Sequence, residues 1–381
     1  MRNWLVWTLI QGANACNIIT GILIAHALTP DDFGRFATMA ASLTILAALL
    51  NPLINELAHS VSQVGGISYH ALGTRSLWTG LAGITMAIAT CLSITRTWTE
   101  QLTMLLALPL SNVSWSWMTG ILIGKNEMPL LAKAQSVGAL FRLVVVGAVL
   151  TVSPALSYLA LAYVISFVAM TLSAAPAVRS LQPASQDLWK TNWGLVVGFF
   201  LLAAPFSLDQ PIVQLWFPAL SGNYAAVMTY AKSIMLLSSP ALTIAYSSAL
   251  QRRATRISPA AFVKLVLSVA GVAGFFWLSR PLFFPLLLGP RYLDLLPMVG
   301  YALLAISFHV ISYALAQVQL AGRALRLIVV LSIAPITQAL CLKALSAPTL
   351  EDLCMVSVVV FAVQLCVVLC VSVLPSRASH A

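Results

Sequence analysis

Long apolar runs alternate with short polar segments along the whole chain. The runs cover approximately residues 5–28, 36–56, 76–95, 102–123, 130–151, 156–176, 193–216, 224–248, 261–279, 295–318, 327–346 and 353–374. A helix needs about 20 apolar residues to cross ~30 Å of hydrocarbon. The runs are continuously apolar, whereas the strands of a membrane barrel would alternate polar and apolar residues. The pattern therefore predicts an all-α integral membrane protein with about 12 transmembrane helices.

The ninth run is followed by a break. Ser279-Arg280-Pro281 separates it from a second apolar piece, 282–288, which Gly289-Pro290 ends. A proline inside a helix removes one backbone hydrogen bond. The second piece therefore either extends the helix past the proline or lies re-entrant near the membrane surface.

Composition agrees with a membrane protein and narrows its chemistry. Of the 381 residues, 60% are hydrophobic and 8% are charged, whereas soluble domains carry about 25% charged residues. The six cysteines lie in or beside apolar runs without metal-ligand spacing, so we interpret them as small buried hydrophobic residues. The sequence contains no Walker-type phosphate-binding motif. We therefore predict a protein that is not an enzyme and binds neither a metal nor a cofactor.

Charge sets the predicted orientation. Most Lys and Arg residues, including Arg252, Arg253 and Arg256, fall in loops on the same side as the N-terminus, and acids such as Asp31 and Asp32 fall on the other. Cytoplasmic loops are the basic ones, so both termini are predicted to be cytoplasmic. The net charge of +10 is then a topology signal and a basis for contact with anionic membrane lipids. No cluster of basic and aromatic residues indicates nucleic-acid binding.

Segments in the two halves of the sequence resemble each other and indicate an internal repeat. Phe33-Gly34-Arg35-Phe36-Ala37 matches Ser221-Gly222-Asn223-Tyr224-Ala225, the same offset matches Pro52 with Pro240, and Gly124-Lys125 resembles Gly322-Arg323. Such a repeat predicts two six-helix bundles in the same orientation. The expected units are an N-terminal bundle, 1–176, a cytoplasmic linker, 177–192, and a C-terminal bundle, 193–381.

The same residues carry a resemblance to a known family. The segment from Leu28 to Ala37 resembles the first outer turn of polysaccharide biosynthesis flippases of the Wzx type. Leu208-Asp209-Gln210 through Ala225 is similar to their seventh-to-eighth helix segment, and Gly289-Pro290-Arg291-Tyr292 to the segment before their tenth helix. The resemblance implies a multidrug/oligosaccharidyl-lipid/polysaccharide exporter fold, with two bundles around a central cavity. It also implies a bacterial inner-membrane protein that flips polyprenyl-diphosphate-linked oligosaccharide by alternating access.

Ionisable residues within the predicted helices are the main functional candidates, because each costs ~2.5–3.5 kcal/mol at mid-membrane. Arg142 lies about 18 Å from the cytoplasmic end of its helix. Its guanidinium suits bidentate binding of a diphosphate. A buried pair with Glu56, or a bond to a helix-end carbonyl, is the structural alternative. Glu56 lies near the inner end of the second helix and is a weaker candidate for gating or ion coupling.

Asp209 and Lys232 lie on consecutive helices that run in opposite directions. Counting residues from the helix ends places the two at depths about 6 Å apart. They are expected to form either a structural ion pair or a pair that opens and closes during transport, with Asp209 gating or coupling an ion. Pro205 and Pro211 on either side of Asp209 predict a kink or a broken helix.

Two polar stripes complete the candidate substrate site. Asn14 and Asn17 follow Gln11 on the first helix at spacings of three. His309, Tyr313 and Gln317 fall at spacings of four on the tenth helix, and so share one face. Such residues suit a sugar, but they also suit hydrogen bonds between helices.

The favoured function is translocation of a polyprenyl-diphosphate-linked oligosaccharide for surface polysaccharide assembly. Arg142 and Lys232 would hold phosphate or acidic sugar, and a polysaccharide polymerase and other assembly proteins would be partners. The main alternative is a cation-coupled drug antiporter of the same superfamily, which predicts an acidic cavity. A membrane polymerase or ligase is disfavoured by the short outer loops, and a non-transporting scaffold stays open.

Overall fold

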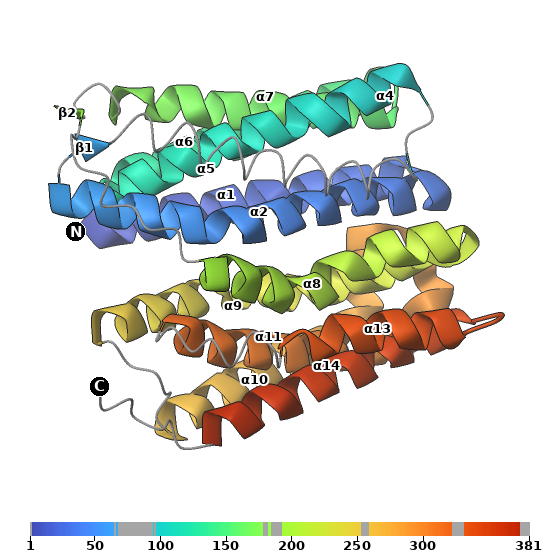
Figure 1. Ribbon diagram of the computed structural model, residues 1–381. Helices are drawn as coiled ribbons and strands as arrows, with labels where there is room; N and C mark the ends of the chain where they lie inside the picture. Colours follow the sequence, from blue (N-terminus) through green and yellow to red (C-terminus); the bar gives the residue numbers. More distant parts are fainter. Residues whose placement is uncertain are drawn as a thin grey trace. The chain divides into compact units, whose positions relative to one another are not determined.

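The computed structural model describes residues 2–64, 66–67, 94, 97–177, 182–183, 193–252, 259–321 and 331–373. These residues are almost entirely helical and divide into two compact units, Met1–Val196 and Val197–Ala381 (Figure 1). Each predicted transmembrane run overlaps a helix except the third, 76–95, which falls almost wholly outside the described residues. The prediction of a multi-helix integral membrane protein is confirmed.

Seven helical spans among the described residues are long and apolar enough to cross a bilayer. They are Trp4–Ala27, Pro30–Leu50, Met128–Val152, Leu156–Ala177, Phe262–Leu288, Pro290–Ala316 and Leu350–Val371. Their lengths of 21 to 27 residues match the ~20 residues that a helix needs to span the hydrocarbon core. The chain is therefore a multi-pass membrane protein.

The N-terminal unit is built from long helices packed side by side. Its elements are α1 (Arg2–Ala27), α2 (Pro30–Val64), β1 (Gly66–Ile67), α4 (Trp98–Leu102), the π-helical turn η1 (Thr103–Ala107), α5 (Leu108–Gly124), α6 (Met128–Val152), α7 (Leu156–Ala174), the 3-10 turn η2 (Ala175–Ala177) and β2 (Gln182–Pro183). Helix α1 packs on α6, α6 on α7, α2 on α5, and α5 on α7. Strands β1 and β2 pair in parallel, Gly66 opposite Gln182, and so join the segment after α2 to the predicted linker, 177–192.

Small residues allow the helices of this unit to approach closely. A Cβ added to Gly124 on α5 would lie 2.6 Å from the Ala58 carbonyl oxygen on α2, and one at Gly120 would lie 3.0 Å from that of Ile54. A Cβ on Gly138 of α6 would collide with Met170 of α7. Small residues one turn apart are the usual means by which membrane helices bring their backbones together, and here they fix α2 against α5.

A buried arginine holds the start of α2. The Arg35 guanidinium donates to the Ile94 carbonyl at 2.8 Å and contacts Asp32 at 3.1 Å and Glu100 at 3.0 Å. Only 5% of Arg35 is exposed. Because three acceptors surround the guanidinium, its charge and its donors are satisfied within the protein. Arg35 therefore fastens α2 to the segment that begins α4.

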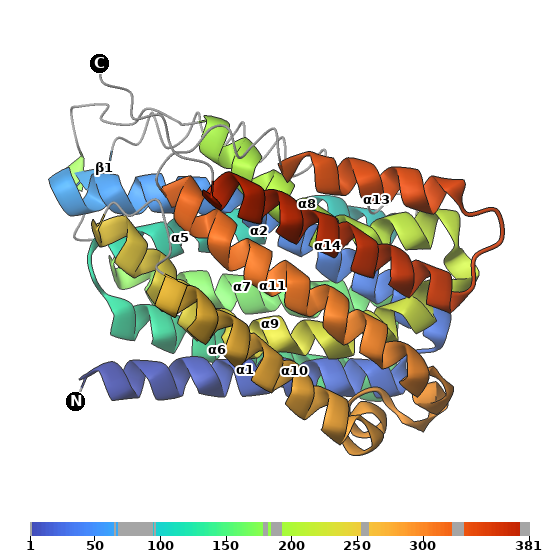
Figure 2. The same cartoon turned by 90° about the horizontal axis from the view of Figure 1, so that it is seen from below.

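The C-terminal unit repeats the pattern of contacts between helices. It contains α8 (Trp193–Trp216), α9 (Pro218–Arg252), α10 (Pro259–Leu288), the 3-10 segment η3 (Pro290–Met298), α11 (Val299–Ala321), α13 (Ile333–Ala344) and α14 (Leu350–Val373). Helix α11 packs against α9, α10 and α14, and α13 packs on α14 (Figure 2). The pairs α9–α11, α11–α14 and α13–α14 correspond to α2–α5, α5–α7 and α6–α7 of the first unit.

Prolines do not break the helices in which they lie. Helix α10 continues through Pro281 and Pro285 to Leu288, so the second apolar piece extends the ninth helix rather than lying re-entrant. It stops at Gly289, whose φ of 98° is readily adopted by glycine. Helix α8 is likewise unbroken through Pro205 and Pro211, so the predicted break beside Asp209 does not occur.

Candidate functional site

Arg142 lies midway along α6 and contacts both neighbouring helices. Its Nη1 donates to Asn17 Oδ1 of α1 at 3.2 Å, and its Nη2 donates to Ser166 Oγ of α7 at 3.0 Å. The guanidinium carbon lies 4.2 Å from the centre of the Tyr163 ring and 5.6 Å from that of Phe167. The sequence predicted Asn17 as part of the site, and the structure brings it to Arg142.

Every described partner of Arg142 is electrically neutral. Its Nε is buried and makes no hydrogen bond to the described residues, and no described carboxylate forms an ion pair with it. The side chain of Glu56, its predicted alternative partner, lies outside the described residues. Arg142 therefore keeps a full positive charge that no described side chain neutralises.

The groups around Arg142 are themselves held in place. Ser166 Oγ donates to the Gly138 carbonyl at 2.9 Å, across the close approach of α6 and α7. It can therefore accept from Arg142 while it donates elsewhere. On α1, half-buried Asn14 lies three residues before Asn17. The arrangement presents a positioned guanidinium with polar and aromatic neighbours.

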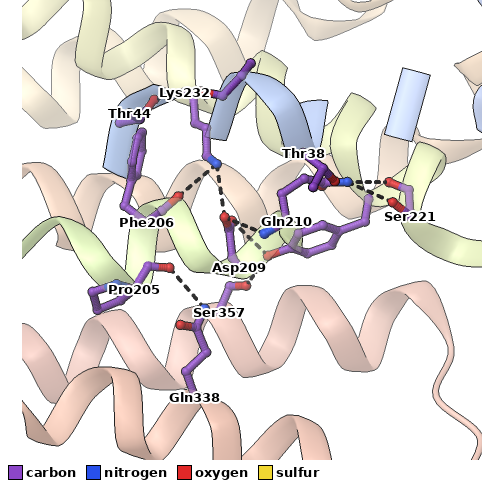
Figure 3. Close-up of polar contacts among 12 residues, drawn as sticks. Thr38, Thr44, Pro205, Phe206, Asp209, Gln210, Ser221, Lys232, Gln338 and Ser357 are labelled. Atoms are coloured by element: carbon purple, nitrogen blue, oxygen red, sulfur yellow. Dashed lines mark hydrogen bonds and ion pairs between the residues drawn. The ribbon is translucent and has the colours of Figure 1, made fainter. Parts of the chain in front are cut away.

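Asp209 and Lys232 meet within the C-terminal unit. Lys232 Nζ on α9 lies 3.3 Å from Asp209 Oδ1 on α8 and also donates to the Phe206 carbonyl at 3.0 Å (Figure 3). The Asp209 side chain is 1% exposed and that of Lys232 is 23% exposed. The ion pair that counting along the helices predicted is therefore present, and it neutralises both charges.

Further hydrogen bonds hold Asp209. The Tyr224 hydroxyl donates to Asp209 Oδ2 at 3.2 Å and shares a 2.8 Å hydrogen bond with Ser357 Oγ of α14. The Gln210 backbone N–H donates to Asp209 Oδ1 at 2.7 Å. Both carboxylate oxygens thus accept bonds from protein donors, as a buried carboxylate requires.

Side chains from neighbouring helices also bind the backbone of α8. Lys232 donates to the Phe206 carbonyl, and Gln338 of α13 donates to the Pro205 carbonyl at 3.0 Å (Figure 3). Gln364 of α14 donates to the Leu202 carbonyl at 3.4 Å. These bonds connect α8 to α9, α13 and α14 around Pro205.

His309 of α11 lies in the interior of the same unit. Its ring stacks on Phe206 at 4.8 Å, lies 4.9 Å from the Phe361 ring, and bonds through Nδ1 to Gln364 Oε1 at 3.1 Å. His309 is fully buried, which fits the alternative of hydrogen bonding between helices. The Tyr313 ring lies 5.8 Å from it, and the side chain of Gln317 lies outside the described residues.

Several residues of these clusters were not singled out from the sequence. Ser166 and Tyr163 lie at Arg142, and Tyr224, Ser357, Gln338 and Gln364 lie around α8. The sequence signal that could have identified Gln338 and Gln364 is the presence of a glutamine within an apolar helix. The interpretation of all cysteines as buried was wrong for Cys366 and Cys370, which are exposed on the apolar helix α14. No group of three or more potential metal ligands occurs among the described residues.

Comparison with solved structures identifies the fold. A multidrug-resistance MATE transporter of the MOP superfamily in an inward-facing conformation superposes with a TM-score of 0.69 at 14% identity, covering 97% of this chain and 96% of that one. The lipid II flippase MurJ in an inward closed conformation gives a TM-score of 0.70 at 11% identity, covering 96% and 87%. A MOP superfamily transporter from Pyrococcus furiosus is described as having a binding pocket of reversed polarity. It gives a TM-score of 0.56 at 16% identity, covering 97% of this chain and 92% of that one.

The chain therefore has the fold of MOP superfamily transporters. No family model matches the sequence, and no curated protein matches it. The structural likeness is to MATE transporters and to MurJ, and the resemblance to flippases of the Wzx type stays a prediction.

Proposed function

We propose that this protein is a flippase that carries a polyprenyl-diphosphate-linked oligosaccharide across the bacterial inner membrane for surface polysaccharide assembly. The observation that carries the proposal is Arg142, a cation midway along a membrane helix whose described partners are all neutral. A charge held at that depth is costly. An anionic substrate that binds it offsets this cost.

A diphosphate matches the donors that Arg142 offers. A guanidinium presents its N–H groups in a planar fork that suits phosphate oxygens. Two of these nitrogens contact Asn17 and Ser166, whereas Nε has no partner among the described residues. The neighbouring Asn14 and Asn17 amides can hydrogen-bond a sugar. The headgroup of a lipid-linked glycan carries both chemistries.

The alternative is a cation-coupled drug antiporter, which the fold of the MATE transporters also accommodates. An antiporter for organic cations is expected to present a carboxylate that is available to bind them. Asp209, the buried carboxylate of α8, is already paired with Lys232. The balance of charges therefore favours an anionic substrate, delivered to polysaccharide polymerase and other assembly proteins as partners.

The test compares two cations on the same helix. Arg142→Gln removes the charge within the cluster, whereas Lys133→Gln removes an exposed charge of α6. Export is measured in cells that lack the native gene, as the ratio of accumulated lipid-linked intermediate to surface glycan. Arg142→Gln should reduce export at least about tenfold, equivalent to ~1.4 kcal/mol of substrate binding. Lys133→Gln should leave export unchanged.

A second variant separates charge from geometry. Arg142→Lys keeps the charge but loses the planar fork, so export should fall to an intermediate level. Full export by Arg142→Gln at normal protein levels would contradict the assignment of Arg142. Full export by cells lacking the protein altogether would contradict the flippase, and drug-efflux measurements would then test the antiporter.

A further inference from the structure

The ammonium group of Lys232 is surrounded like a small bound cation. It contacts a backbone carbonyl oxygen, Phe206 O at 3.0 Å, and a carboxylate oxygen, Asp209 Oδ1 at 3.3 Å. The ammonium also lies 4.5 Å from the centre of the Phe206 ring, within the range of a cation–π contact. Carboxylate and carbonyl oxygens are the ligands that hard metal cations prefer.

The direction of the lysine side chain is informative. Lysines in membrane helices ordinarily extend their ammonium groups toward the interface, where water solvates the charge. Lys232 instead points to α8 and ends between Phe206 and Asp209 (Figure 3). The attraction between the ammonium group and the Asp209 carboxylate, which is 1% exposed, therefore outweighs the solvation that the ammonium would gain at the membrane interface.

The carboxylate also fits the role of a cation ligand. Tyr224 and the Gln210 N–H orient Asp209, so its position does not depend on Lys232 alone. Removal of the lysine side chain would leave an oriented carboxylate and a carbonyl oxygen around the place of the ammonium.

We propose that Lys232 is a tethered cation that permanently occupies a small-cation site in the C-terminal unit. Asp209 consequently takes no soluble cation in the wild-type protein. When the ammonium is removed, the vacated site binds a monovalent metal cation such as Na⁺ or K⁺. This inference concerns cation binding by the protein itself and does not depend on the identity of the transported substrate.

The experiment measures the apparent unfolding temperature of the purified full-length protein in detergent. NaCl, KCl and choline chloride are compared at equal ionic strength, so that the anion and the ionic strength stay constant while the cation changes. The wild type should unfold at the same temperature in all three salts. Lys232→Ala should be stabilised by at least about 3 °C in NaCl or KCl relative to choline chloride. The double variant Lys232→Ala/Asp209→Asn should lose that stabilisation.

Two results would overturn the inference. One is stabilisation of the wild type by Na⁺ or K⁺ that Asp209→Asn abolishes, because Asp209 would then bind a soluble cation beside the lysine. The other is a folded Lys232→Ala protein that does not distinguish the three salts. The comparison of the wild type with Asp209→Asn uses only proteins that retain Lys232. It therefore stays decisive even where Lys232→Ala does not fold.

Discussion

The two units differ in the partners that surround a cationic side chain within a membrane helix. Lys232 of the C-terminal unit lies 3.3 Å from a carboxylate that is 1% exposed. Arg142 of the N-terminal unit contacts an amide, a hydroxyl and an aromatic ring, with no carboxylate among its described partners. A paired buried charge contributes to the structure of its own unit. An unneutralised one can attract a ligand, so we assign structure to the first and binding to the second.

The predicted internal repeat gives neither charged site a counterpart in the other half. The offset that matches Gly34 with Gly222 matches Gly21 with Asp209 and Thr44 with Lys232. The offset that matches Gly124 with Gly322 places Leu340 opposite Arg142. The units thus share their pattern of helix contacts but not their charged residues.

The largest expected effect comes from breaking the pair in the C-terminal unit. Lys232→Met leaves Asp209 buried without a counter-charge, and removing one partner of such a pair costs about 3–5 kcal/mol. Asp209→Asn should cost less, roughly 1–3 kcal/mol, because the 23% exposed lysine can turn toward water. Unfolding of the purified protein in detergent measures both.

The control for this prediction is the corresponding change in the other unit. Arg142→Met orphans no described carboxylate, and Ser166 keeps its bond to Gly138, so its stability should fall less than that of Lys232→Met. The double variant Lys232→Met/Asp209→Asn should be more stable than the sum of the single losses indicates. Equal losses for Arg142→Met and Lys232→Met would remove the distinction between the two cations.

The second prediction concerns a substitution that gives Arg142 a carboxylate partner, as Lys232 has in Asp209. Asn17→Asp places a carboxylate where Asn17 Oδ1 now lies 3.2 Å from Arg142. The new ion pair should leave stability unchanged or raise it by up to about 1 kcal/mol. It should also cancel the charge that attracts an anion and reduce glycan export at least about tenfold.

Asn14→Asp is the matched control for this substitution. It adds the same charge to the same helix, three residues away from Asn17, without replacing a partner of Arg142. We expect export by Asn14→Asp to exceed export by Asn17→Asp clearly. Similar export by the two variants would mean that negative charge on α1, rather than neutralisation of Arg142, determines the effect.

The sequence predicted helices and depths better than it predicted partners. Apolar runs near 20 residues define membrane helices directly, and a fixed rise per residue brought Asp209 and Lys232 to similar depths. The rotation of α7 against α6 cannot be read from a run that is apolar on all sides. Ser166 and Tyr163 therefore went unnoticed as neighbours of Arg142.

Features of the C-terminal unit were left open by the sequence for a related reason. Pro205 and Pro211 predicted a kink or a broken helix, and α8 is continuous through both prolines, with Gln338 and Gln364 of distant helices donating to its backbone nearby. His309 was placed on a polar stripe that suits either a sugar or hydrogen bonds between helices, and its ring is buried against Phe206 and Phe361. These features depend on contacts between helices far apart in the sequence, which local spacing does not encode.

The smallest expected effect concerns a feature that the two units share, the threonine cap at the start of a helix. Helix α2 and helix α14 begin with the same cap, a threonine followed three residues later by an aspartate. The Asp32 N–H donates to Thr29 Oγ1 at 3.3 Å, and the Asp352 N–H donates to Thr349 Oγ1 at 3.3 Å. Such caps satisfy backbone donors at the start of a helix. Thr29→Ala and Thr349→Ala should therefore each lower stability by about 1 kcal/mol.

Thr29→Ser and Thr349→Ser keep the hydroxyl and are the matched controls, with near wild-type unfolding in detergent. Export should be unchanged in all four variants, because neither cap contacts Arg142. Thr29→Ala should cost slightly less than Thr349→Ala, since Asp32 retains its bond to Arg35 at 3.1 Å. If one cap variant abolished export while the other did not, the functional asymmetry of the units would extend beyond their buried charges to the helix ends.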